Sequence, residues 1–229
     1  MTTLELLLQQ YPEQQKILAD YLLSASQIQG IPQTTLTHLT QRILPSQFPE
    51  YAQLATVKLL RDQKQFADAL VLLEKFEPYQ KHNELQVSIL KSVLFAENKQ
   101  QAEAAKILKN LDAKHMNAEQ LALVAYVYRL LQQNTSALQT IQLAYAQQPT
   151  NETIQKEYLN ILIALRSYEM AAAFSQKHHL TDKDENLTWQ TRVGKFSQNI
   201  NEAIKQQKYL SARAESDHKS FEQLDQVLK

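Results

Sequence analysis

The stretch ALQTIQLAYAQQP, residues 137–149, places its small and large side chains at helical intervals. Ala137 begins it, Ile141 follows four residues later, Ala144 three after that, and Pro149 ends it. Residues three and four apart lie on the same face of a helix, so these positions form one stripe that starts with a small side chain. Proline cannot continue a helix and restricts the residue before it. The stretch is therefore predicted to be a helix that ends before Pro149 and packs closely on a neighbour through Ala137.

The same spacing occurs at three other places in the chain, each centred on an alanine. The four alanines are Ala69, Ala104, Ala137 and Ala171. They are separated by 35, 33 and 34 residues, and a period of about 34 residues is that of the tetratricopeptide repeat, a pair of antiparallel helices. Positions twelve residues before each alanine are also small or apolar, and they are Val57, Ser92, Ala125 and Leu159. The sequence therefore predicts four helix pairs of one kind.

A fainter copy of the repeat is expected upstream of these four. Its first helix would span residues 13–26, and Thr35 would stand in the place of the alanine. Other helix starts are indicated by capping residues: Asn117 followed by Gln120, and Asp182 followed by Glu185, have the spacing of capping boxes that satisfy free backbone N–H groups. Two further starts are marked by Pro49 and Thr150.

The composition indicates an all-α protein. The 229 residues include two glycines, six prolines and no cysteine, and common residues such as Leu, Ala, Gln, Glu and Lys favour helices. With the period, this predicts a tetratricopeptide-repeat right-handed α-solenoid of antiparallel helix pairs, forming one domain over residues 1–229. The expected parts are degenerate N-terminal helices over 1–48, repeats over 49–81, 84–116, 117–149 and 151–180, and C-terminal helices over 182–229.

The C-terminal part departs from the repeat. We expect one helix over 182–196, a break near 194–201, and then a long helix with few large apolar side chains that is largely solvated or awaits a neighbour. Solenoids normally finish with a polar capping element. Because the chain starts abruptly on LELLL and ends on QVLK without such an element, we expect it to be a piece of a longer protein.

Several functional classes are disfavoured by the sequence. The formal net charge is zero, whereas proteins that bind nucleic acid without sequence preference carry a basic excess, so no nucleic-acid partner is expected, including RNA read by helical repeats. No apolar run approaches the ~20 residues that span a bilayer, and the N-terminus lacks the features of a signal peptide. No glycine-rich phosphate loop, nucleophile elbow or pair of histidines at zinc-protease spacing is present. We therefore expect no enzymatic activity, no cofactor and no metal site.

Two local features leave alternatives open. His178 and His179 lie close in sequence to Asp182, Asp184 and Glu185. One alternative is that these five residues form a metal site. We expect a structural role instead, because adjacent histidines in a loop point in different directions and Asp182 suits a helix cap. The only tryptophan, Trp189, could stack on a sugar ring, but packing of its helix onto the last repeat is the favoured interpretation.

The inner surface of the predicted solenoid is the candidate binding surface, because the first helix of each pair lines it. Ile89 and Val93 are expected to make the middle of this groove apolar. Lys, Arg and Tyr side chains are suited to interfaces, and the cations indicate a partner that offers carboxylates or carbonyl oxygens. A solvated helix face with lysines placed for solubility is the alternative. The expected partner-binding residues are Tyr51, Lys58, Arg61, Tyr126, Arg129, Lys156 and Asn160.

From about Glu119 onward the sequence resembles a known family. The matching stretches are AYVYRLL (125–131), EYLNILIALRSYEMAAA (157–173), TRVGKF (191–196) and a following charged helix containing KYLSARAES. They are similar to the periplasmic tetratricopeptide region of the outer-membrane porin that exports poly-β-1,6-N-acetylglucosamine. The resemblance covers a little under half of the chain.

The resemblance implies a non-catalytic scaffold in the periplasm, attached in the full-length parent to an outer-membrane β-barrel. In that family the repeats recruit the periplasmic polysaccharide deacetylase and guide the partly deacetylated polymer to the pore, which supports biofilm formation. The deacetylase is thus the first expected partner and the polymer the second. Since the partly deacetylated polymer is cationic, the cations of the inner surface favour a protein partner. The alternative is a tetratricopeptide adaptor in another assembly or secretion pathway.

Overall fold

The computed structural model describes Tyr11, residues 14–27, 32–80, 82–180 and 198–208, and Glu215. All regular structure in these ranges is helical, and no strand occurs in them, which confirms the all-α prediction for this part of the chain. The contacts divide the chain into two units, Met1–Gln148 and Pro149–Lys229, and each is described by itself below.

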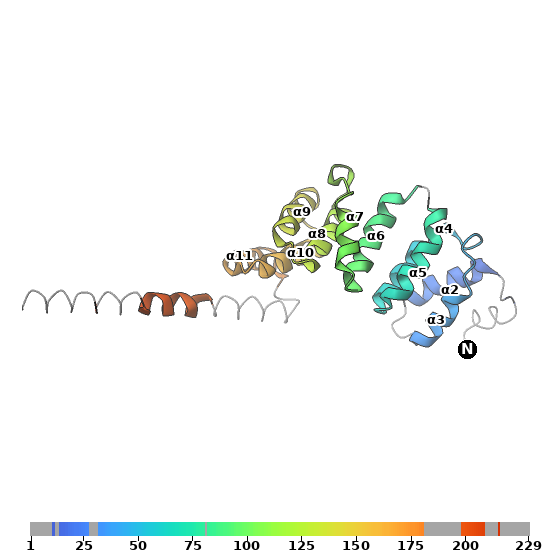
Figure 1. Cartoon of the computed structure of the whole chain (residues 1–229), viewed down its shortest axis with the longest axis horizontal. Helices are drawn as coiled ribbons and strands as arrows, with labels where there is room; N and C mark the ends of the chain where they lie inside the picture. Colours follow the sequence, from blue (N-terminus) through green and yellow to red (C-terminus); the bar gives the residue numbers. More distant parts are fainter. Residues whose placement is uncertain are drawn as a thin grey trace, which may run out of the picture. The chain divides into compact units, whose positions relative to one another are not determined.

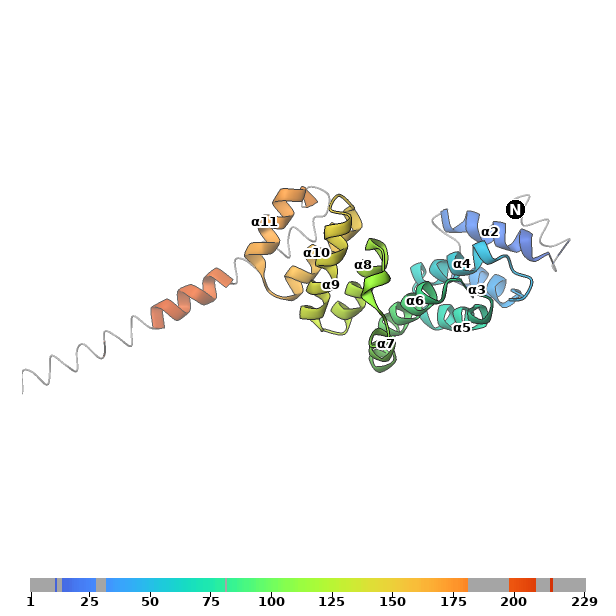
Figure 2. The same cartoon turned by 90° about the horizontal axis from the view of Figure 1, so that it is seen from above.

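The first unit is a succession of helix pairs (Figure 1). Consecutive helices pack on each other, as in α4 with α5, α6 with α7 and α8 with α9, and the first members of successive pairs also meet, as in α2 with α4 and α6 with α8. Figure 2 shows the same succession from above. The helices are α2 (Gln15–Gln27), α3 (Gln33–Gln41), α4 (Glu50–Asp62), α5 (Phe66–Phe76), α6 (Glu84–Glu97), α7 (Gln101–Leu108), α8 (Ala118–Leu130) and α9 (Asn134–Gln147), with short 3₁₀ turns at Glu77–Tyr79 and Ala113–His115.

Each alanine that defines the repeat is the fourth residue of the second helix of its pair. All four have an exposed fraction of 0%, because a side chain larger than a methyl group would keep the two helices of a pair apart. The positions twelve residues before them, which belong to the first helix of each pair, are equally buried. The close packing predicted for Ala137 is therefore confirmed, and α9 ends before Pro149 as expected.

The link between the two helices of each pair has the same geometry four times. One residue in each link has a positive φ, and these residues are Lys64, Lys99, Gln132 and Arg166, with φ of 60°, 62°, 59° and 58°. In each link this residue donates its N–H to a carbonyl three residues earlier, and the next residue donates to a carbonyl five residues earlier. This pair of bonds ends a helix tightly and satisfies its last carbonyl groups. A left-handed residue thus recurs with the period of the buried alanines.

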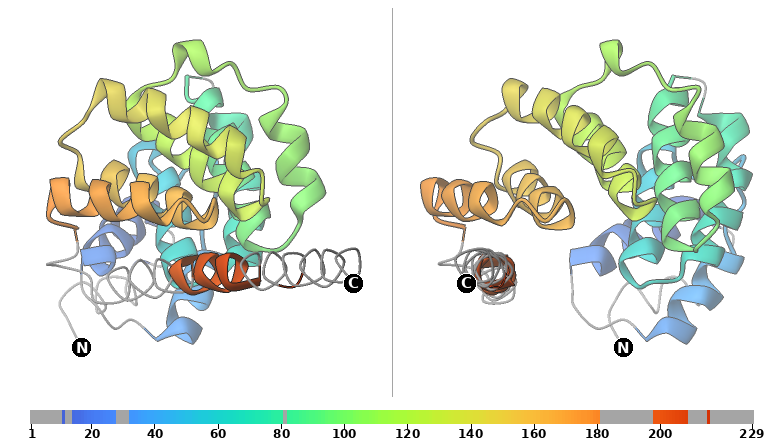
Figure 3. Two further views of the ribbon diagram at one scale, coloured as in Figure 1. Left: turned by 90° about the vertical axis from the view of Figure 1, so that its left-hand side faces the viewer. Right: turned by 60° about the vertical axis from the view of Figure 1, so that its left-hand side comes forward.

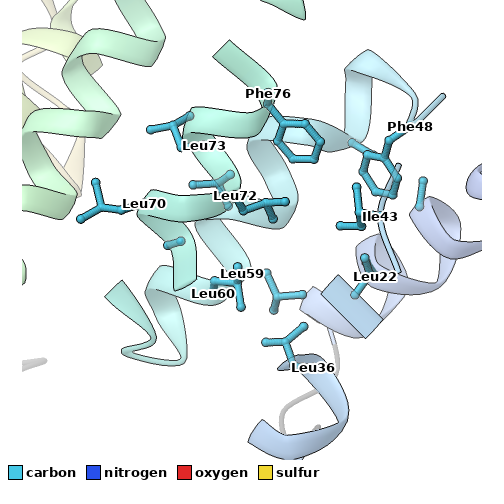
Figure 4. Packing of buried hydrophobic residues seen from close by; sticks show 14 of the residues in the cluster. Leu22, Leu36, Ile43, Phe48, Leu59, Leu60, Leu70, Leu72, Leu73 and Phe76 are labelled. Carbon is cyan, nitrogen blue, oxygen red and sulfur yellow. The ribbon is translucent and has the colours of Figure 1, made fainter. Parts of the chain in front are cut away.

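The core of the first unit runs through α2, α3, α4, α5 and α6. It contains leucines from each of these helices, together with Phe48 and Phe76, whose rings stack with centroids 5.6 Å apart (Figure 4). Buried glutamines join the links to this core: Gln53 donates to the Phe48 carbonyl at 3.0 Å and accepts from Gln80 at 2.7 Å. The Phe48 carbonyl, which precedes α4, is thereby satisfied by a buried side chain.

Three local predictions can be compared with these helices. The capping box of Asn117 and Gln120 is confirmed in both of its hydrogen bonds. The placement of Thr35 is wrong by one residue, because Thr35 is exposed and Leu36 has an exposed fraction of 0%. The Asp182 capping box lies outside the described residues.

The second unit contains α10 (Glu152–Ala164) and α11 (Tyr168–His178), which pack on each other (yellow and orange in Figure 3), and a helix over residues 198–208. Asn151 caps α10 by accepting from the backbone N–H groups of Thr153 and Ile154. Residues 198–201 are helical, so the break predicted near 194–201 does not include them. Residues 199–208 are exposed, as predicted for a solvated C-terminal helix.

Among the described residues, no helix is both long and apolar enough to cross a bilayer.

Candidate functional site

Three of the predicted partner-binding residues lie together in the first unit. Arg61 is in the last turn of α4, and Tyr126 and Arg129 are in the second half of α8. Arg61 and Tyr126 both bond Glu97, the last residue of α6, which the sequence analysis did not single out, and Arg129 lies over the Tyr126 ring. We call Arg61, Glu97 and Tyr126 the clasp.

The clasp joins three helices through one carboxylate. Arg61 donates from Nε to Glu97 Oε2 at 2.7 Å and from Nη2 to Glu97 Oε1 at 2.8 Å. Tyr126 donates its hydroxyl to the same Oε1 at 2.8 Å. The guanidinium carbons of Arg61 and Arg129 lie 5.7 and 5.2 Å from the centroid of the Tyr126 ring, within the range of cation–π attraction. A bidentate arginine–carboxylate pair is geometrically specific as well as charge-assisted, so the clasp fixes the ends of α4, α6 and α8 relative to one another.

Burial and charge shift the acid–base behaviour of the clasp. The side chains of Arg61 and Glu97 are 23% and 11% exposed. Burial and the hydrogen bond to Glu97 raise the pKa of Tyr126 to about 12, against the opposing effect of Arg61. The hydrogen bond to Glu97 also raises the pKa of Arg61. The tyrosine therefore stays a neutral donor, and the arginine a cation, throughout the physiological range.

An open pocket of about 420 Å³ adjoins the clasp. Its walls combine the charged groups of the clasp with apolar surface from α5, α6 and α8, and its rim carries one further acid and one further base. The lining residues are Arg61, Asp62, Lys64, Phe66, Ala96, Glu97, Tyr126 and Leu130. Since the opposite charges are balanced, the pocket is suited to polar and apolar contacts of a partner side chain more than to a free ion.

The middle of the predicted groove is closed. Ile89 and Val93 were expected to line it, but both have an exposed fraction of 0% and belong to the interior, so that interpretation is wrong. The positions equivalent to Val93 in the preceding and following repeats are less buried. Lys58 on α4 is exposed, and Tyr126 on α8 is half-buried. The physical reason for the closed middle is that α6 packs against α5, α7 and α8, and both Ile89 and Val93 belong to that packed interior.

The other predicted residues of the first unit lie nearer the N-terminal half of α4. Tyr51 is 57% exposed, and its hydroxyl donates to Asp20 Oδ1 on α2 at 2.8 Å. This hydrogen bond raises the pKa of Tyr51. Lys58 is exposed. The surface of α4 therefore presents one aromatic ring and one cation, with the Arg61 head group already bonded to Glu97.

The predicted residues of the second unit are both on α10. Lys156 contacts Glu152 Oε1 at 3.3 Å, one turn earlier, and Asn160 is half-buried. At the end of α11, His178 Nδ1 lies 3.1 Å from Gln155 Nε2, and its ring packs on Phe174. Burial lowers the pKa of His178, and the charges of Lys177 and His179 act in the same direction.

No cluster of His, Cys, Asp or Glu that could bind a metal ion occurs in the part of the chain that the structure describes. The alternative metal site would join His178 and His179 to Asp182, Asp184 and Glu185. These three acidic residues lie outside the described residues, and so does Trp189.

Glu97 could have been found from its position. It lies 36 residues after Arg61 and 29 before Tyr126, so it falls at the end of the first helix of the intervening repeat. The first helices of the two flanking repeats each carry a hydrogen-bond donor, Arg61 and Tyr126. A search for opposite charges one repeat apart would have paired Arg61 with Glu97.

No family model matches this chain, and comparisons with curated proteins and with solved structures gave no match either.

Proposed function

We propose that this chain is a non-catalytic protein-binding scaffold of the tetratricopeptide-repeat class, wound as a right-handed α-solenoid. The observation that carries the proposal is the recurrence of one helix-pair geometry, with a buried alanine and a left-handed link residue at intervals of 33 to 35 residues. Stacked helix pairs of this period form extended surfaces that bind proteins.

The binding surface proposed for the first unit consists of side chains of α4 and α8. It contains Tyr51 and Lys58, which are exposed, and Arg129, which is half-buried beside the clasp. Aromatic and arginine side chains contribute most at protein interfaces, and exposed cations mainly orient an acidic partner. Lys156 and Asn160 on α10 are proposed as a separate contact surface in the second unit.

The partner we propose is a periplasmic polysaccharide deacetylase, and the setting is the periplasmic part of an outer-membrane poly-N-acetylglucosamine export porin. The support is the resemblance of residues 125–131 and 157–173, which form parts of α8, α10 and α11. Guidance of the partly deacetylated polymer is a further proposed role. A protein-interaction adaptor in another assembly or secretion pathway is the second candidate, because the repeat geometry supports any protein partner equally.

Biolayer interferometry of this chain against the periplasmic deacetylase of the same organism tests the proposal. The variant to compare is Lys58→Glu with Arg129→Glu, which reverses two charges and leaves the Arg61–Glu97 pair in place. A matched control is Lys106→Glu with Lys109→Glu, which makes the same charge change at exposed positions at the end of α7. Circular dichroism checks that both variants fold.

We expect the parent and the control to bind and the Lys58/Arg129 variant to lose at least tenfold in affinity. Equal binding by all three would move the contact away from α4 and α8. Absence of binding by the parent would contradict the export-scaffold proposal and leave the adaptor as the better candidate.

A further inference from the structure

The pocket beside the clasp has an apolar lining that stays partly exposed. Phe66 begins α5, and Tyr126 and Leu130 lie one turn apart on α8; all three line the pocket and are half-buried. Residues four apart lie on the same face of a helix, so α8 contributes two neighbouring side chains and α5 the third. The volume of about 420 Å³ lies within the range of ligand pockets, about 300–1,000 Å³. The pocket therefore offers apolar contact area to a side chain of a partner.

The clasp forms the polar wall of this pocket, and its charges are already paired. Both carboxylate oxygens of Glu97 accept from Arg61, and one of them also accepts from Tyr126. A charged side chain that entered here would have to compete for these bonds, and burying it without a partner is unfavourable. An aromatic ring, in contrast, can pack on the rings of Phe66 and Tyr126 and on the guanidinium of Arg61. The walls thus suit an aromatic side chain better than a charged one.

The charges that stand beside the clasp are mainly positive. Asp62 and Lys64 line the pocket, and Arg129 lies over the ring of the clasp tyrosine at 5.2 Å. Lys58 precedes Arg61 by three residues and shares its face of α4. These three cations accompany a single acid, so acidic residues on either side of an inserted ring are favoured. Such charges set the orientation of a partner more than its affinity.

We propose that this pocket binds an aromatic side chain presented by an acidic segment of a partner protein. The ring packs against Phe66, Tyr126 and Leu130, and the flanking acids are attracted by Lys58, Lys64 and Arg129. No movement of the helices is needed, because the pocket is open in this structure. The inference rests on the proposed protein-binding function and names the chemistry of the partner at one site.

An array of short immobilised peptides, probed with the full chain, tests the proposal. Each peptide has one central residue, varied over all amino acids, between flanks that are acidic, neutral or basic. The first variant is Lys64→Glu, which reverses the charge of an exposed residue that lines the pocket. Its matched control is Lys99→Glu, because Lys99 is also exposed and holds the same place in the next link, with a φ of 62° against 60°. The second variant, Leu130→Gln, makes the apolar lining polar.

We expect the parent and Lys99→Glu to bind peptides with a central Phe, Tyr or Trp in acidic flanks at least fivefold more strongly than peptides with a central Ala or with basic flanks. Lys64→Glu should weaken binding of the acidic aromatic peptides at least fivefold, and Leu130→Gln should abolish the preference for an aromatic centre. Circular dichroism checks that each variant folds. If Leu130→Gln does not fold, Lys64→Glu decides the question by the same criteria.

Three results would overturn the proposal: no preference for aromatic centres in acidic flanks, unchanged binding by Lys64→Glu, or an equal loss in Lys99→Glu. The deacetylase measurement is separate, so the two ideas can fail independently. A parent that binds the deacetylase but shows no peptide preference would keep the scaffold and remove this pocket from it. A parent that shows the preference but does not bind the deacetylase would keep the pocket and exclude that partner.

Discussion

At the scale of single residues, the fold depends on which positions must be small. Each of the four pairs α4–α5, α6–α7, α8–α9 and α10–α11 has in its second helix an alanine whose exposed fraction is 0%. The interior of a protein is close-packed, so additional atoms at such a point require either a strained side chain or a shift of the helix. The repeat is visible in the sequence because this requirement recurs in these four pairs.

Ala137→Leu should overpack the crossing of α8 and α9. We expect it to lower the free energy of unfolding by about 1–3 kcal/mol. Urea denaturation followed by circular dichroism would measure the loss. Ala146→Leu is the matched control, since it makes the same change at an exposed position of the same helix and should stay within about 0.5 kcal/mol of the parent. Equal effects of the two substitutions would mean that Ala137 is not a packing constraint.

Lys99→Gly should stabilise the chain, because Lys99 has a φ of 62° in the link between α6 and α7. A left-handed conformation costs about 1–2 kcal/mol for a residue with a Cβ atom, and glycine avoids this cost but loses more entropy on folding. We expect a net gain of about 0.5–1 kcal/mol in the same urea assay. Lys109→Gly, at a position with a φ of −62°, should be neutral or destabilising. A loss of stability in Lys99→Gly would contradict the assignment of strain to this link.

These two residue types also show what the sequence could and could not predict. The buried alanines were found because a small side chain among large ones at a fixed period is visible in the letters. The left-handed residues were missed, since lysine, glutamine and arginine occupy the positions where glycine would have indicated the turn. Their positive φ follows from the hydrogen bonds of the helix end, which the residue types do not indicate.

At the scale of helices, the sequence predicted which segments pair but not how far they approach. Apolar spacing and the Asn117 capping box placed α8 correctly. The approach of α4 to α8 depends on a contact across an intervening pair, and no periodic pattern within one repeat encodes it. That is why Glu97, which joins them, was overlooked.

The Tyr126 hydroxyl should make the stability of the clasp depend on alkaline pH. Its pKa is raised from 10.0 to about 12 in the folded chain, so the folded state holds a proton that the unfolded state releases. The resulting stabilisation is present below about pH 10 and is lost as the pH rises towards 12. Between these values the parent should lose more stability than Tyr126→Phe, with the difference measured by urea denaturation at a series of pH values. Identical pH profiles would contradict the raised pKa of Tyr126 and its hydrogen bond to Glu97.

At the scale of the whole molecule, balanced charge limits what the chain can bind. It has 24 basic and 24 acidic residues, and Arg61, one of the predicted partner-binding cations, is already paired with Glu97. Binding to a nucleic-acid backbone requires several cations that can replace counterions together. We therefore expect the repeats to bind a partner through side-chain contacts and not a polyanion.

The expected outcome is no saturable binding of a fluorescently labelled single-stranded RNA or DNA oligonucleotide in an anisotropy titration at ~50 mM salt, where electrostatic binding is strong. Any residual signal should disappear at ~200 mM salt, because nonspecific contacts to phosphate weaken steeply as salt is added. A variant with Asp62→Lys, Glu119→Lys and Glu84→Lys, all at exposed positions of the first helices, raises the net charge by six and provides the internal comparison. If this variant gains salt-sensitive binding and the parent shows none, net charge is what prevents the interaction. Saturable binding by the parent that persists at ~200 mM salt would instead show base contacts on the inner helices, and it would contradict the protein-binding proposal for this surface.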